Sequence, residues 1–112
     1  MGLSFGAYML ITLDLIKQHC RIDSDDEDEL LELYESAAQQ HIEKQLDRKL
    51  FADEVPEDVV NGLVVNSAIK QAMLMTIAHW YEHRESVVLG VVSKEIEEGT
   101  WRLIQPYRIM GV

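Results

Sequence analysis

The stretch from Ala68 to Tyr81 constrains this chain more than any other part of its sequence. Apolar side chains lie on nearly every side of the helix that it predicts, and Lys70, Gln71 and His79 are among its few polar residues. A helix that is apolar all round must be buried in a core or an oligomer. We therefore predict a buried helix from Ser67 to about Glu85. Its apolar surface is more than one small chain easily covers, which indicates self-association. The stretch is too short and too polar to cross a membrane, which takes about 20 apolar residues.

A second long helix is predicted from Asp25 to Arg48. Its acidic first turn complements the positive end of the helix dipole, Arg48 places a cation at the other end, and Ser24 or Asp25 is the expected N-cap. Apolar residues repeat every three or four positions, which predicts a buried face, whereas Glu35 and other acidic residues are expected on the outer face. The residues predicted to pack between the two long helices are Leu30, Tyr34, Ile42, Leu46, Ile69, Met73, Ile77 and Trp80.

Shorter elements complete a mainly α fold with two long packed helices. A short N-terminal helix is predicted from Thr12 to Cys20. A long connecting loop follows at 50–66, where Asn61-Gly62 between β-branched residues marks either a small hairpin or an irregular loop. Residues 87–98 are expected to be extended, a short helix is predicted at 100–105, and the chain ends in an extended C-terminal tail. We assign residues 9–112 to one domain and residues 1–8 to an N-terminal extension without a signal sequence.

Charge and cysteine content limit the possible functions. The chain carries 20 acidic and 10 basic residues, for a formal net charge of −10. Affinity for nucleic acid depends mostly on basic groups, so a protein that coats DNA is disfavoured, although DNA can slide past an acidic surface. The single cysteine, Cys20, cannot form an internal disulfide and falls on an apolar helical face, so we expect a buried, unreactive thiol.

One motif suggests an enzyme. The segment His79-Trp80-Tyr81-Glu82-His83 matches the H-x-x-E-H pattern of zinc peptidases, in which two histidines one helical turn apart bind the metal. A catalytic zinc also needs a third protein ligand and a position for water. The few residues after His83 offer only carboxylates in or beside predicted loops. We therefore interpret the histidines as structural, and predict no catalytic residue, metal site or cofactor.

The acidic run from Asp23 to Glu29 resembles a calcium-binding loop only superficially. An EF-hand loop needs Gly at its sixth position and Glu at its twelfth, where this chain has Asp28 and Tyr34. The run is therefore interpreted as a solvated helix start or as a patch for a basic partner.

Two groups of aromatic, apolar and cationic residues are candidates for an interface, because Trp, Tyr and Arg are its favoured anchors. One ends the third helix and the other forms the tail, and each either fills the chain's own core or contacts a neighbour. We hypothesise that the tail, 101–110, contacts a neighbouring subunit or another protein, where its cations meet the acidic start of the second helix. The candidates are Trp80, Tyr81, Arg84, Trp101, Arg102, Leu103, Ile104, Pro106, Tyr107 and Arg108, with Asp25, Asp26, Glu27, Asp28 and Glu29 as the acidic set.

Several of these segments resemble the head–tail connector (adaptor) family of lambdoid and related tailed bacteriophages. They are the start Ile11-Thr12-Leu13-Asp14-Leu15-Ile16-Lys17, the stretch Ala78-His79-Trp80-Tyr81-Glu82-His83-Arg84-Glu85, and the ending Pro106-Tyr107-Arg108. The resemblance runs from Met9 over nearly the whole chain. It departs from the family at Asn66-Ser67, where relatives often carry a proline.

The resemblance implies a small, mainly helical, non-enzymatic virion protein. Members form a ring that docks on the portal protein after DNA packaging, extends the DNA channel and offers a platform to a downstream neck or tail protein. It implies location in the virion neck, and in the host cytoplasm during assembly. A dodecamer would match the portal, and no cofactor or membrane is involved. The alternative that the residues leave open is a small acidic helical module that binds and regulates or inhibits a basic protein.

Overall fold

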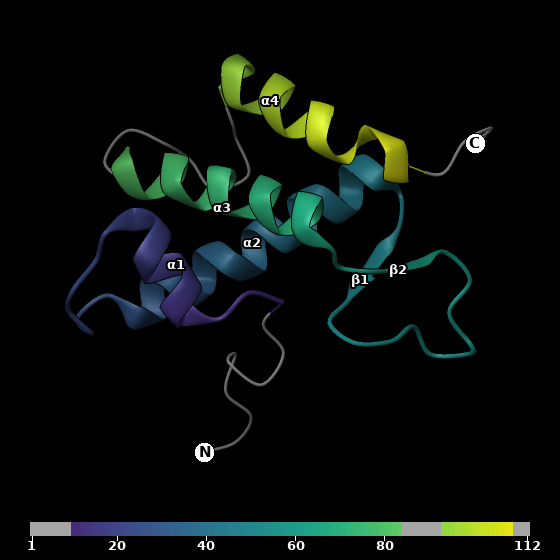
Figure 1. The fold of residues 1–112 in the computed structure, drawn as a ribbon, viewed down its shortest axis with the longest axis horizontal. Coiled ribbons are helices and arrows are strands. Elements are labelled where there is room, and N and C mark those ends of the chain that lie inside the picture. The colour runs from purple at the N-terminus through teal and green to yellow at the C-terminus, as the bar shows by residue number, and fades with distance from the viewer. Residues whose placement is uncertain (1–9, 84–92, 109–112) are drawn as a thin grey trace.

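Four helices and a two-stranded sheet make up the part of the chain that the structure, a computed structural model, describes: residues 10–83 and 93–108 (Figure 1). The mainly α fold predicted from sequence is confirmed. In chain order the elements are α1 (Leu13–Cys20), α2 (Asp28–Leu46), β1 (Lys49–Phe51), β2 (Gly62–Val64), α3 (Ser67–Glu82), α4 (Lys94–Ile104) and a 3-10 turn, η2 (Gln105–Tyr107).

Helix α3 forms the centre of the fold, as its sequence predicts. It contacts α1, α2 and α4, and Figure 1 shows it between α4 on one side and α1 and α2 on the other. Asn66 caps its start by accepting a hydrogen bond from the Ile69 N–H (3.0 Å). The fully or almost fully buried residues of α3 are Ile69, Ala72, Met73, Leu74, Thr76, Ile77 and Trp80. One chain therefore covers most of this helix.

Helix α2 presents a slightly different face to the core than we predicted. Leu31 is fully buried, whereas the predicted Leu30 is only half-buried, and Tyr34, Ala38, Ile42 and Leu46 complete the stripe. The helix also begins later, at Asp28, because the Asp25 carboxylate pairs with Lys17 and makes no capping bond. Its C-cap, Asp47, has the left-handed backbone (φ 59°) that commonly ends a helix.

Of the two alternatives for the segment around Asn61-Gly62, a small hairpin or an irregular loop, the structure excludes the hairpin, and part of the segment forms a short strand. Strands β1 and β2 pair in parallel, with Leu50 opposite Leu63. The Lys49 N–H donates to the Asn61 carbonyl (3.1 Å) and the Val65 N–H to the Phe51 carbonyl (2.8 Å). A Cβ atom at position 62 would collide with the Val55 side chain. Glycine is therefore needed here for close packing, not for a tight turn.

The expectation of an extended segment up to residue 98 is also wrong where the structure describes it. Helix α4 already begins at Lys94, and the Ser93 hydroxyl caps it by accepting from the Ile96 N–H (3.3 Å). Gly99 lies inside α4, where an added Cβ would come within 3.1 Å of the Met75 side chain on α3. Gly99 thus lets the two helices approach closely.

Glu35, expected on the outer face of α2, is 2% exposed. Its Oε2 accepts hydrogen bonds from the Leu10 N–H (2.8 Å) and the Ile11 N–H (3.3 Å). The carboxylate therefore holds the chain as it enters α1 and allows Leu10 and Ile11 to join the core. Burial raises the pKa of Glu35 above its ordinary value of 4.5, and the two N–H groups oppose that rise.

Glu35 makes stability depend on pH in a defined direction. Because its pKa is higher in the folded chain, its contribution to stability is full below pH 4.5 and is lost as the pH rises through the folded-state pKa. The Glu35→Gln variant keeps an acceptor but does not titrate. We expect urea unfolding to show wild type gaining stability relative to Glu35→Gln as the pH falls from 7 to below 4.5.

Glu35→Ala is the companion variant, since it leaves two buried N–H groups without an acceptor. It should lower the free energy of unfolding by about 1–3 kcal/mol. A wild-type-to-Gln difference that does not change with pH would contradict this role of Glu35.

Candidate functional site

The residues predicted to form an interface are divided by the structure between the core and the surface. Trp80 is 1% exposed, and its ring centroid lies 6.1 Å from that of Tyr34 on α2. It therefore fills the core of its own chain, one of the two alternatives for this residue. Tyr81 is half-buried beside it, and Arg84 lies outside the described residues.

The tail does not extend away from its own chain. Ile104 is fully buried in the same core as α3, and Trp101, Leu103 and Tyr107 are half-buried against it. The described part of the tail thus packs on the core of its own chain, which was the alternative to contact with a neighbour. It does so because α4 is amphipathic and α3 offers it an apolar surface. Only the polar members and the proline remain exposed: Arg102, Pro106 and Arg108.

Arg48 fixes the end of the tail. The sequence suggested a cation at the end of the second helix, but Arg48 follows that helix and its guanidinium points to two carbonyl groups. Nη2 donates to the Gly62 carbonyl (2.7 Å) and Nη1 to the Tyr107 carbonyl (3.1 Å). One half-buried side chain therefore joins the end of α2, strand β2 and η2.

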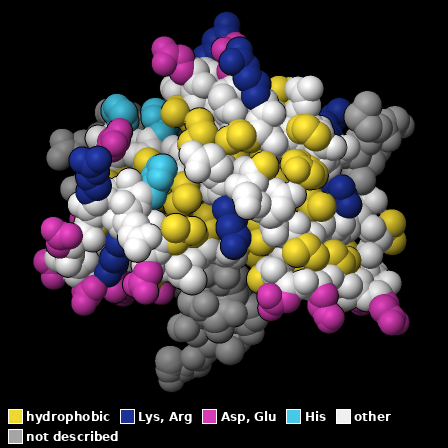
Figure 2. Space-filling view, viewed as in Figure 1, with side chains coloured by type: hydrophobic (Ala, Val, Ile, Leu, Met, Phe, Trp, Pro, Cys, Tyr) yellow, Lys and Arg dark blue, Asp and Glu magenta, His cyan; other side chains and the backbone are white. Residues whose placement is uncertain are grey.

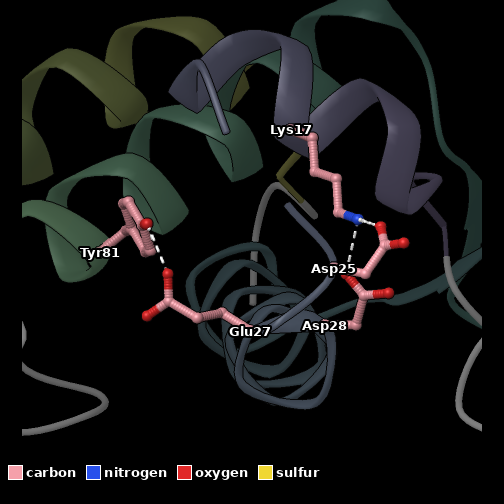
Figure 3. Close-up of polar contacts among 5 residues, drawn as sticks. All are labelled: Lys17, Asp25, Glu27, Asp28 and Tyr81. Atoms are coloured by element: carbon pink, nitrogen blue, oxygen red, sulfur yellow. Dashed lines mark hydrogen bonds and ion pairs between the residues drawn. The ribbon is translucent and has the colours of Figure 1, made fainter. Parts of the chain in front are cut away.

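The acidic start of α2 is partly occupied within its own chain. Lys17 on α1 forms ion pairs of 2.6 Å with Asp25 and Asp28, and the Tyr81 hydroxyl on α3 donates to Glu27 (2.7 Å) (Figure 3). These contacts tie three helices together at one corner of the molecule. Three of the five carboxylates that we expected to receive the tail of a neighbour are therefore paired within their own chain. Among the described residues, only Asp26 and Glu29 of this set form no ion pair or side-chain hydrogen bond.

The Lys17 cluster is electrostatically matched. Hydrogen bonds to Asp25 and then Asp28 raise the pKa of Lys17, and the bond from Lys17 lowers the pKa of Asp25. Lys17 and Asp25 therefore both stay charged across the neutral range. Asp25 is well exposed, so the pair orients the loop before α2 more than it stabilises the fold.

The H-x-x-E-H histidines lie next to each other at the C-terminal end of α3. The ring centroids of His79 and His83 are 4.9 Å apart, and the His83 Nδ1 lies 3.0 Å from the His79 carbonyl oxygen. Within residues 10–83 and 93–108, no three His, Cys, Asp or Glu side chains are arranged to hold a metal ion. Nor is any helix in these ranges long and apolar enough to cross a membrane.

On the face shown in Figure 2, acidic side chains gather mainly at the edges and apolar side chains lie nearer the centre. Acidic side chains gather at the left edge of the view, over α1 and the start of α2, and at the lower right, beside the strands (Figure 2). The second group is the exposed loop between β1 and β2, with Asp53, Glu54, Glu57 and Asp58. Val60 in the same loop is 88% exposed, the highest value among the large hydrophobic residues described.

Sequence reasoning missed the roles of three residues whose side chains hold separate segments together: Lys17, Glu35 and Arg48. Glu35 carried a signal, because it lies four residues after Leu31 and three before Ala38, on the stripe that faces the core. Lys17 and Arg48 carried none, since their partners are distant in sequence or are backbone carbonyls.

A comparison with protein-family models identifies the family of this chain. The family model for phage gp6-like head-tail connector proteins matches residues 10–108. The chain belongs to this family. The connector family comprises structural phage proteins, and membership makes the chain a component of the virion neck that associates with head or tail proteins. The match begins at Leu10 and ends at Arg108, and so spans α1 to η2. Neither the curated proteins nor the solved structures yielded a match.

The position of the connector's tail predicts the effect of two neighbouring substitutions. Ile104→Ala removes a fully buried side chain and should lower the free energy of unfolding by about 2–5 kcal/mol. Arg102→Ala, on the exposed face of the same helix, should change it by no more than about 0.5 kcal/mol. Chemical denaturation of both variants measures the difference. If Ile104→Ala is as stable as Arg102→Ala, α4 does not belong to its own core.

Proposed function

We propose that this connector is a ring-forming structural subunit of the phage neck. In this role it docks on the portal protein after DNA packaging, extends the DNA channel, and provides a platform for the next neck or tail protein. Twelve subunits would match the symmetry of the portal. The observation that carries the proposal is the family match over residues 10–108, which covers every described element.

The charge of the chain supports a conduit rather than a DNA-binding protein. The formal net charge is −10, and the exposed loop between β1 and β2 carries four carboxylates. A channel that carries negative charge repels the phosphates of DNA, so DNA passes through it without being held. No covalent step is part of this role.

The test of this function is co-sedimentation of the full-length protein with purified portal rings. We expect the protein to sediment with the portal as a single larger species of fixed stoichiometry. An unrelated acidic helical protein of similar size is the control for non-specific adhesion. A connector that stays a monomer or dimer at every concentration, and ignores the portal, would contradict the proposal and favour the acidic regulatory module.

DNA binding gives a second, independent test. Wild-type protein should bind duplex DNA only weakly at physiological salt, with a Kd above the micromolar range as an order of magnitude. A variant with Asp53, Glu54, Glu57 and Asp58 changed to Asn or Gln should bind more tightly, because the repulsion is reduced. Tight, salt-sensitive binding by the wild type would overturn the conduit role.

A further inference from the structure

Helix α2 separates two surface hollows of different charge. One, the acidic hollow, lies beside α1 and the loop before α2, and Asp14, Arg21, Ile22 and Asp23 are among the residues that line it. The other, the basic hollow, lies at the C-terminal end of α2. Helix α2 has 19 residues and is roughly 28 Å long, so the two hollows lie near its opposite ends. Figure 1 shows these two ends of α2 on opposite sides of the molecule.

The basic hollow combines a small excess of cations with an apolar projection. Its lining carries three cations (Lys44, Arg48 and Lys49) and two carboxylates (Glu43 and Asp47), and Glu43 accepts hydrogen bonds from the Leu50 N–H and the Gln39 side chain. Lys44 and Lys49 are exposed on its wall and form no ion pair among the described residues, while Arg48 behind them is held by two carbonyl groups. Val59 and Val60 form its rim, and Val60 is 88% exposed. Burial of Val60 against a partner would remove this apolar side chain from water, which is favourable.

The acidic hollow has a small charge excess of the opposite sign, since its lining carries three carboxylates (Asp14, Asp23 and Asp25) and two cations (Lys17 and Arg21). Asp14 and Asp23 are exposed and, among the described residues, form no ion pair, because Lys17 in the same hollow is occupied by Asp25 and Asp28. The half-buried Ile22 lies between them in sequence and lines the same hollow, so it offers an apolar floor. The hollow has a volume of about 600 Å³, which is ample for a valine side chain.

We propose that the basic hollow of one connector docks on the acidic hollow of a second copy, with Val60 inserted beside Ile22 and with Lys44 and Lys49 facing Asp14 and Asp23. Two different surfaces at opposite ends of a subunit make a head-to-tail contact, which closes into a ring when the rotation between subunits permits it. This inference rests on the proposed ring and names the surfaces that form it. The apolar contact supplies most of the affinity, and the charges set the orientation.

Charge exchange between the two ends tests the contact. Lys44→Glu/Lys49→Glu should weaken self-association of the full-length protein about tenfold or more, as measured by sedimentation at low salt with and without portal rings. Asp14→Lys/Asp23→Lys should do the same. The chain carrying all four substitutions should assemble again, because the pairing is restored with its signs exchanged. Val60→Asp should block assembly in each background.

Lys70→Glu/Lys94→Glu is the matched control, since it makes the same change in net charge at exposed positions that line neither of these two hollows. It should assemble like wild type. Circular dichroism and urea midpoints establish that each variant is folded.

Each other outcome has a distinct meaning. Wild-type assembly by both double variants would overturn this contact and leave the ring intact as a proposal. Loss in both double variants without recovery in the quadruple variant would also overturn the pairing. Failure of the wild type to assemble, with or without the portal, would overturn the ring itself.

Discussion

The rest of this structure depends on the burial of α3. Six of its apolar side chains are almost entirely removed from solvent, and each large one contributes about 1.5–3 kcal/mol when it is buried. No single neighbouring helix covers such a surface. Helices α1 and α2 cover one side and α4 covers another, so the positions of all the other helices follow from this one requirement.

A few polar side chains then fix where the connecting segments lie. Glu35 holds the chain before α1, Lys17 and Tyr81 hold the turn before α2, and Arg48 holds the end of the tail. Because these contacts use up polar groups inside the subunit, they define which charges are left for other molecules. The exposed lysines at one end of α2 and the exposed aspartates at the other remain available.

Much of the fold was predictable from sequence, because periodicity reports burial directly. The α3 helix, the cap at Thr12 and the approximate extent of α2 all followed from local patterns. The parallel pairing of β1 and β2 did not, since it depends on the close approach of Val55 to Gly62 rather than on turn residues. The packing of the predicted interface residues was harder to predict for the same reason. The composition of the tail does not show whether it packs on the α3 of its own chain or on that of a neighbour. The packing of Ile104 and Gly99 in the structure places it on its own α3.

In the proposed ring, each subunit completes its own core and then assembles through its surface. Electron cryo-microscopy of the assembled protein, bound to the portal or alone, tests this most directly. It should show a closed ring in which each α4 packs on the α3 of its own chain and the two ends of α2 meet across the subunit boundary. An α4 exchanged between neighbouring subunits, or an assembly that does not close, would contradict it.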